Sequence, residues 1–396
     1  MAQAIISRRG GESDNSYATI TFNGVSALKK IEVVPLTEPQ CYLAATTVGD
    51  YALFGGGAGN GYVSRIDAYN TSLTKTVNKS LSVARRDLAA TTVGDYALFG
   101  GGVGSNNSYL STVDAYNTSL TRTTPTALSQ SRSELAATTV GNYALFGGGS
   151  SPISSTVDAY NTSLTRTTPT VLSQARYRLA ATTVGNYALF GGGMSAFDSY
   201  SSTVDAYNSS LIRTTPTSLS EARSELAATT VGNYALFGGG ALISDGHYAS
   251  SNTVDAYNIN LTRSTPTALS GARSDLAATT VGNYALFGGG SSPNSSTVDA
   301  YNTNLTRSTP TALIEARYDL AATTVGNYAL FGGGWGSNGP TKTVDAYYVN
   351  NKVLVYPGTK YKLGSMASES TSSTMQEIET TAPITGYIKI KDATIN

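Results

Sequence analysis

The sequence predicts an all-β protein: a seven-bladed β-propeller with short β-containing extensions on its N- and C-terminal sides. Three observations predict this fold. A cassette of the form LAATTVG-(N/D)-YALFGGG occurs seven times, its copies begin 44 to 50 residues apart, and no segment has a sustained helical period. Repeats of this length are typical of architectures in which each unit buries its apolar face against its neighbours. The copies begin at Leu43, Leu88, Leu135, Leu179, Leu226, Leu276 and Leu320.

The third copy shows the first two predicted strands of a repeat. Residues 135–140 (LAATTV) form the first run, residues 143–146 (YALF) form the second, and Gly141-Asn142 joins them. Gly and Asn tolerate the positive φ of a tight turn, so the runs are predicted to pair as a hairpin. Three glycines then end the second strand. The wedges between neighbouring sheets are expected to be Phe54, Phe99, Phe146, Phe190, Phe237, Phe287 and Phe331.

Two further runs complete the repeat. Residues 156–160 (TVDAY) form the third, a polar turn follows at 161–163, and residues 165–169 (TRTTP) form the fourth. Proline lacks the donor that a sheet ladder needs, so the fourth strand is predicted to be the outer edge of its sheet. Four antiparallel strands per repeat is the number expected of a propeller blade. The equivalent prolines are Pro125, Pro216, Pro266 and Pro310.

A propeller must also close into a ring. Residues 30–43 align without a gap to residues 122–135, which contain a fourth strand. We therefore expect residues 30–36 to form the outer strand of the last blade, beside the third strand at 344–347. Residues 353–356 are the alternative candidate for that place.

The repeated residues resemble the kelch motif. Six of the seven repeats have an arginine, a strand of small residues, Tyr-Ala-Leu-Phe-Gly-Gly, a loop and Val-Asp-Ala-Tyr; the first repeat lacks the arginine and has Ile66 in place of the valine. The resemblance covers about residues 37–350. It implies a kelch-like propeller, although Thr and Pro occupy the fourth strand, where that family often has Trp. Residues 6–11 (ISRRGG), together with the repeat body and a short β tail, are similar to tail-associated proteins of phages and prophages of Gram-positive bacteria. The spaced tyrosines are Tyr69, Tyr116, Tyr160, Tyr207, Tyr257, Tyr301 and Tyr347.

Three regions are expected: an N-terminal extension over 1–26, the propeller over 27–358, and a Ser/Thr-rich connector with a short β tail over 359–396. Residues 17–22 and 384–390 are the expected strands of the two extensions. The 396 residues include 26 acidic and 26 basic side chains, which argues against nucleic acid as a partner. No apolar run is long enough to insert into a membrane, and the short apolar stretch at the start leads us to expect no secretory signal. The expected location is a phage particle, or otherwise the cytoplasm.

The inventory of reactive side chains argues against catalysis. The only histidine is His247 and the only cysteine is Cys41, so no multi-histidine metal site can form and neither a metal nor a cofactor is expected. Hydrolysis catalysed by a pair of carboxyl groups stays an alternative, because counting side chains does not exclude it. The recurrent aspartates favour a structural role, because an active site needs an asymmetric arrangement. They are Asp67, Asp114, Asp158, Asp205, Asp255, Asp299 and Asp345.

Variation is concentrated in the loops between the glycines and the third strand. These loops are expected on the same face as the connections between blades, so one face would carry most differences on a constant scaffold. The connections hold arginines that we expect to donate hydrogen bonds between blades: Arg86, Arg132, Arg176, Arg223, Arg273 and Arg317. The loops are rich in Tyr, Ser, Gly and Asn, a mixture favoured in recognition surfaces. Simple drift of surface loops is the alternative. The ligand-binding candidates are Trp335, Tyr200, Phe197, Tyr248, His247, Tyr109, Tyr62, Tyr177, Arg178 and Tyr318.

Three functions follow as hypotheses. The first is a non-catalytic binding module of a phage or prophage particle, which recognises a cell-surface glycan or protein and contacts other particle proteins through its termini. The second is an intracellular kelch-like scaffold that binds a partner protein. The third is a carbohydrate-active enzyme, which the single histidine makes the weakest of the three.

Overall fold

The computed structural model describes residues 4–8, 18–22, 26–78, 80–197, 199–355, 360–361, 368–369 and 376–380. The chain divides into two compact units, one formed by Lys30–Tyr347 and the other by Met1–Lys29 together with Tyr348–Asn396. Each unit is described by itself.

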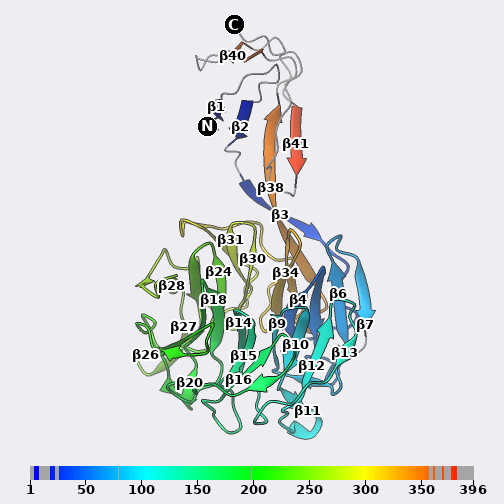
Figure 1. The fold of residues 1–396 in the computed structure, drawn as a ribbon, viewed down its shortest axis with the longest axis vertical. Helices are drawn as coiled ribbons and strands as arrows, with labels where there is room; N and C mark the ends of the chain where they lie inside the picture. Colours follow the sequence, from blue (N-terminus) through cyan, green and yellow to red (C-terminus); the bar gives the residue numbers. More distant parts are fainter. Residues whose placement is uncertain are drawn as a thin grey trace. The chain divides into compact units, whose positions relative to one another are not determined.

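The larger unit is the predicted seven-bladed propeller. Each blade is an antiparallel sheet whose innermost strand is the Ala-Ala-Thr-Thr-Val run. The innermost strands contact one another in the order β4, β9, β14, β18, β24, β30 and β34, and β34 returns to β4, so the ring is closed. Figure 1 shows the blades following one another from blue to orange.

Each blade contains four strands, in order from the inside outwards. The first blade has β4 (Ala44–Val48), β5 (Tyr51–Gly55), β6 (Ile66–Asn70) and β7 (Lys75–Asn78); the second has β9 (Ala89–Val93), β10 (Tyr96–Gly100), β12 (Val113–Asn117) and β13 (Arg122–Thr123). The third has β14 (Ala136–Val140), β15 (Tyr143–Gly147), β16 (Val157–Asn161) and β17 (Arg166–Thr167); the fourth has β18 (Ala180–Val184), β19 (Tyr187–Gly191), β22 (Val204–Asn208) and β23 (Arg213–Thr214). The fifth has β24 (Ala227–Val231), β25 (Tyr234–Gly238), β28 (Val254–Asn258) and β29 (Arg263–Ser264); the sixth has β30 (Ala277–Val281), β31 (Tyr284–Gly288), β32 (Val298–Asn302) and β33 (Arg307–Ser308). The seventh has β34 (Ala321–Val325), β35 (Tyr328–Gly332), β38 (Val344–Val355) and β3 (Ser26–Glu32).

The outer strands are shorter than the sequence predicts. In the third blade, β17 pairs with β16 only at Arg166 and Thr167, whereas the predicted run continued to Pro169. Proline has no N–H to donate to the ladder, so pairing stops before it.

Adjacent blades are held together by the phenylalanines of the second strands. Phe146 is fully buried and its ring lies edge-on to Tyr160 of the same blade, with centroids 6.0 Å apart. A Cβ placed on Gly100 of the preceding blade would lie 2.8 Å from the Phe146 ring, so glycine is required for this close approach. The predicted wedges are therefore confirmed.

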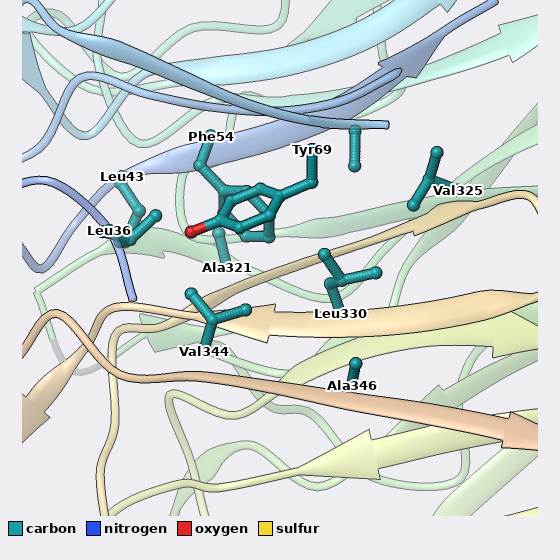
Figure 2. Packing of buried hydrophobic residues seen from close by; sticks show 10 residues of the cluster. Leu36, Leu43, Phe54, Tyr69, Ala321, Val325, Leu330, Val344 and Ala346 are labelled. Carbon is teal, nitrogen blue, oxygen red and sulfur yellow. The ribbon is translucent and has the colours of Figure 1, made fainter. Parts of the chain in front are cut away.

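The ring closes where the seventh blade meets the first. The N-terminal segment supplies the outer strand of the seventh blade, as predicted, but that strand is β3 (Ser26–Glu32) and not 30–36. Pro35 cannot donate to a ladder, and the chain has already turned towards the first blade at Thr37, whose N–H donates to Asp67 (2.9 Å). Figure 2 shows the seam, where Phe54 and Tyr69 of the first blade lie beside Leu330 and Val344 of the seventh.

The alternative closing segment belongs to another pairing. Residues 353–355 extend β38 and pair with β41 (Gln376–Thr380) in the smaller unit, and residue 356 lies outside the described residues. In the same unit β1 (Ala4–Arg8) pairs with β2 (Ala18–Phe22), and β39 (Lys360–Tyr361) pairs with β40 (Ser368–Glu369). These strands confirm the β character of the extensions, while the strand expected at 384–390 lies outside the described residues.

Candidate functional site

One face of the propeller carries both the variable loops and the connections between blades. In each repeat, the residue two positions before the cassette leucine pairs antiparallel with the first residue after the three glycines. In the third repeat the N–H of Ser150 donates to the carbonyl of Ser133 (2.8 Å). The loops and connections therefore lie on one face, as predicted. The pairs are Cys41–Ala58, Arg86–Val103, Ser133–Ser150, Tyr177–Met194, Ser224–Ala241, Ser274–Ser291 and Tyr318–Trp335.

The residues immediately before the cassette leucines form a ring at the centre of this face. All seven have positive φ, between 51° and 55°, although none is glycine. Each donates its backbone N–H to the carbonyl of its counterpart in the neighbouring repeat, over 2.9–3.1 Å, so seven hydrogen bonds make a closed belt. We call these residues the mouth ring: Tyr42, Asp87, Glu134, Arg178, Glu225, Asp275 and Asp319.

The mouth ring surrounds a cavity of about 550 Å³. Tyr248 and Tyr318 also line this cavity, together with the seven cassette leucines, which we call the leucine collar. A second cavity of about 360 Å³ follows along the innermost strands and is lined by their alanines and threonines. Hydroxyl groups of adjacent blades hydrogen-bond around it, as between Thr138 and Thr183 (2.9 Å). The axial channel therefore passes from a charged mouth through an apolar collar to a hydroxyl-lined passage.

Arg178 neutralises one side of the mouth. Its guanidinium donates to Glu134 (Nε to Oε1, 2.6 Å) and to Glu225, and it lies over the Tyr177 ring, 5.8 Å from the centroid. Burial lowers the pKa of Arg178, but the two carboxylates outweigh burial and raise it above its ordinary value. The guanidinium is thus permanently charged and held on two sides.

A second arginine, Arg86, lies beside the mouth ring and contacts two of its members, Tyr42 and Asp87. Arg86 donates to Asp87 over 2.8 Å, and its guanidinium lies 5.4 Å from the Tyr42 ring and 5.7 Å from the Tyr62 ring. Burial is the main cause that raises the pKa of Asp87 to about 6, and Glu134 adds to it against the opposing effect of Arg86. The mouth ring itself has five carboxyl groups and one guanidinium, a formal charge of −4 when all are ionised.

The neighbouring carboxyl groups of Asp275 and Asp319 have different surroundings. Asp275 accepts hydrogen bonds from the hydroxyls of Ser274 (2.9 Å) and Ser291 (2.8 Å). Burial and, second to it, the negative charge of Asp275 raise the pKa of Asp319, a hydrogen bond from Tyr42 lowers it, and the combined result is a pKa of about 8. Asp87 and Glu225 add weaker repulsion. Near neutral pH Asp319 therefore holds a proton in much of the population.

The raised pKa of Asp319 predicts that stability falls as pH rises. The folded protein retains this proton up to about pH 8, whereas the unfolded chain releases it near pH 3.8, so ionisation opposes folding across that window. Asp319→Asn is expected to raise the midpoint of thermal unfolding at pH 9 relative to the wild type and to leave it nearly unchanged at pH 4. Thermal melts at pH 4, 6.5 and 9 measure this. Asp95→Asn, on the opposite face, is the control, and an equal offset at all three pH values would contradict the prediction.

The structure distributes the sequence-predicted site residues over three positions. Arg178, Tyr248 and Tyr318 line the central cavity. The ring of Tyr62 lies beside the guanidinium of Arg86, and the ring of Tyr177 lies beside that of Arg178. Trp335 is next to the cavity-lining Tyr318, because the backbones of these two residues are paired. The rest lie on the loops and are not among the residues that line the cavity; Phe197 is 87% exposed and Tyr109 is 42% exposed. These loop candidates are Phe197, Tyr200, Tyr109 and His247.

Sequence reasoning missed six of the seven members of the mouth ring. Only Arg178 was among the candidates, because it departs from the common pattern. The missed signal is an aligned column: the residue before each cassette leucine differs between repeats while the cassette itself is copied. The missed residues are Tyr42, Asp87, Glu134, Glu225, Asp275 and Asp319.

One predicted arginine was also misaligned. The second-repeat equivalent of the recurrent arginines is Arg85, which is fully buried, and not Arg86. The buried arginines pair with the recurrent aspartates: Arg132 donates to Asp158 (2.6 Å) and to the carbonyl of Phe146 (3.2 Å). Each such arginine therefore ties a connection to the blade that it enters, which supports the structural role predicted for the aspartates.

Within the described residues, no three His, Cys, Asp or Glu side chains are grouped so that they could hold a metal ion. The described part of the chain also has no helix with the length and apolar character required to span a lipid bilayer.

Comparisons with known proteins add evidence on the fold. No protein-family model matches the chain, and no curated protein matches its sequence. A solved structure titled "Structure of YjhT" superposes with a TM-score of 0.52 at 12% identity, covering 81% of this chain and 97% of that chain. Likeness at this identity concerns the fold alone, which is a β-propeller in both.

Proposed function

We propose that this protein is a non-catalytic binding module that recognises a cell-surface glycan through the central cavity and the loops around it. One observation carries the proposal. A copied scaffold surrounds a concave, polar cavity, and the residues that differ between repeats gather on that face.

The chemistry of the cavity suits a sugar. The carboxylates of the mouth ring accept hydrogen bonds from hydroxyl groups, and the phenols of Tyr42, Tyr248 and Tyr318 both donate and accept. Tyr248 donates to Glu225 (3.4 Å) and hydrogen-bonds to Ser274 (3.3 Å), so its ring is positioned by polar contacts at one end. Aromatic faces provide contact area for the C–H faces of a sugar.

A phage or prophage particle is the setting we propose. The support is the resemblance of residues 6–11 and of the kelch-like repeats noted in the sequence. In addition, the segments on both sides of the propeller belong to one compact unit of their own. Such a unit would serve as the attachment to other particle proteins.

A carbohydrate-active enzyme is the second candidate, and one observation favours it. Asp319 has a raised pKa and adjoins Asp275 in a cavity, which is a combination found where carboxyl groups act as acid and base. Release of new reducing ends from a bound glycan would support this candidate, and binding without turnover would support the binding module.

The proposed function is tested by binding to cells and glycans. Labelled full-length protein is applied to intact bacteria and to a glycan array, and Arg178→Ala and Tyr248→Ala are compared with the wild type. Each variant is expected to weaken binding at least tenfold, because each removes a polar anchor of the cavity wall. Circular dichroism checks that the variants are folded.

Asp95→Asn supplies a matched control. Asp95 is exposed in the hairpin turn at the other end of the innermost strand, and five other repeats already have Asn at that position. Its binding is expected to equal that of the wild type. Undiminished binding by both cavity variants would show that the central cavity is not the recognition site.

A further inference from the structure

We infer, building on the proposed function, that the central cavity accepts the terminal, uncharged unit of a glycan, inserted along the propeller axis with an apolar substituent on the leucine collar. The same site rejects sugars that carry a carboxylate. The enclosure of the cavity, its layered lining and its balance of charge each support one part of this inference.

The enclosure of the cavity requires a free end. Seven blades surround it, and the backbone belt between mouth-ring residues is continuous, with each N–H bonded to the next carbonyl over 2.9–3.1 Å. A ligand can therefore enter only along the axis. An internal unit of a linear glycan would need one neighbour to pass along the threonine-lined passage, or both neighbours to leave through the mouth, whereas a terminal unit needs a single neighbour to leave through the mouth.

The layers of the lining orient that unit. The collar leucines are each 7–8% exposed and lie between the charged mouth ring and the threonine passage. The leucine side chains pack mainly in the cores between blades, and an apolar group that reaches the collar covers the small part of each leucine that remains exposed, while ring hydroxyls stay level with the carboxylates. An N-acetyl methyl group fits this arrangement, and a hydroxyl in its place would reach the collar without a hydrogen-bond partner there.

The charge of the mouth excludes anions. Of the two arginines, Arg178 is held by Glu134 and Glu225, and Arg86 is held by Asp87. An incoming carboxylate would face five carboxyl groups, of which Asp319 is largely protonated near neutral pH, and each guanidinium near it already has an acidic partner. The mouth ring therefore keeps a net negative charge. A cavity of one predominant sign lowers the local concentration of ligands of that sign. A neutral sugar meets no such repulsion.

The test is calorimetric titration of the full chain with matched methyl glycosides in the gluco and galacto series. The probes are the N-acetylamino sugar, the parent hexose and the hexuronic acid. In at least one series the N-acetylamino sugar is expected to bind at least fivefold more tightly than the parent hexose. The uronate is expected to bind at least tenfold more weakly than the hexose.

A double variant tests the charge argument by reversal. Glu134→Gln with Glu225→Gln releases Arg178 and changes the formal charge of the mouth ring from −4 to −2. The affinity for the uronate is expected to rise at least tenfold, with a smaller change for the N-acetylamino sugar. Asp50→Asn with Asp95→Asn makes the same change of charge on the opposite face and should leave the uronate affinity unchanged.

A cyclic oligosaccharide tests whether binding requires a free chain end. Maltohexaose and the cyclic hexamer of glucose contain the same units, and only the linear form has termini, so only the linear form is expected to bind. The inference is overturned if the uronate binds the wild type as tightly as the hexose, if the cyclic hexamer binds as tightly as the linear one, or if no neutral glycoside binds. In each case continued labelling of whole cells would leave the proposed function standing, while loss of labelling would refute it as well.

Discussion

Asp158→Ala is expected to lower the free energy of unfolding by about 3–5 kcal/mol. Asp158 and Arg132 are both fully buried, and the guanidinium donates to the carboxylate over 2.6 Å. The carboxylate also accepts the N–H of Ser129 (3.0 Å). Removing the carboxylate leaves a buried guanidinium without its counter-charge and an N–H without its acceptor. This destabilises the fold more than replacing both members of the ion pair by apolar residues would. Chemical denaturation followed by circular dichroism measures the loss.

The first repeat supplies a natural comparison for this prediction. It has Gln40 at the position of the buried arginine, and its aspartate, Asp67, is held by the N–H (2.9 Å) and hydroxyl (2.5 Å) of Thr37. Arg132→Gln is therefore expected to cost less than half as much as Asp158→Ala. Arg166, which reaches Asp158 from the partly exposed side at 3.3 Å, is the second control. If Arg166→Ala proved as costly as Asp158→Ala, the buried pair would not be the source of the effect.

Gly148→Ala is expected to lower the free energy of unfolding by about 3 kcal/mol, as the sum of backbone strain and overpacking. Gly148 has φ +70°, and a Cβ there would lie 2.5 Å from the carbonyl oxygen of Arg176. That carbonyl belongs to the connection into the next blade and accepts the N–H of Gly149 (2.9 Å), so it cannot move away without breaking the join between blades. Thermal and chemical unfolding report the loss.

Gly246→Ala separates the two causes. Gly246 has φ +76°, close to that of Gly148, but a Cβ there would meet nothing within 4 Å. The loop variant carries the backbone strain alone and is expected to cost about 1 kcal/mol. Equal costs for the two variants would mean that the contact between blades does not demand glycine at position 148.

The architecture could be predicted because its signal is local and repeated seven times. The Gly-Asn turn between β14 and β15 requires positive φ, and Gly141 has φ +52° in the structure. The sequence predicted that Phe146 packs between neighbouring sheets and that Tyr160 belongs to a series of regularly spaced tyrosines, because the same residues recur at the same place in every repeat. The predicted bounds of β3 and of the short outer strands were wrong. Proline and the turn towards the next blade set where these strands end, and the composition of the segment does not show at which residue that happens.

The mouth ring could not be found in the same way. Asp275 and Asp319 are 44 residues apart in sequence, and each directly precedes a cassette leucine, but only the belt places them side by side. Their closeness depends on closure of the whole ring, which also produces the raised pKa of Asp319. The aromatic loop residues drew attention because they are large and unusual, but only Tyr248 and Tyr318 of these line the cavity.

The sequence alone determined the number of blades, the order of strands within each blade and the face on which the loops vary, because periodicity and turn residues act within one repeat. Tertiary structure alone decided which side chains share a site. A ring of seven repeats brings one residue from each to the axis, and the charge, enclosure and layering of the resulting cavity arise only once the first and seventh blades have joined.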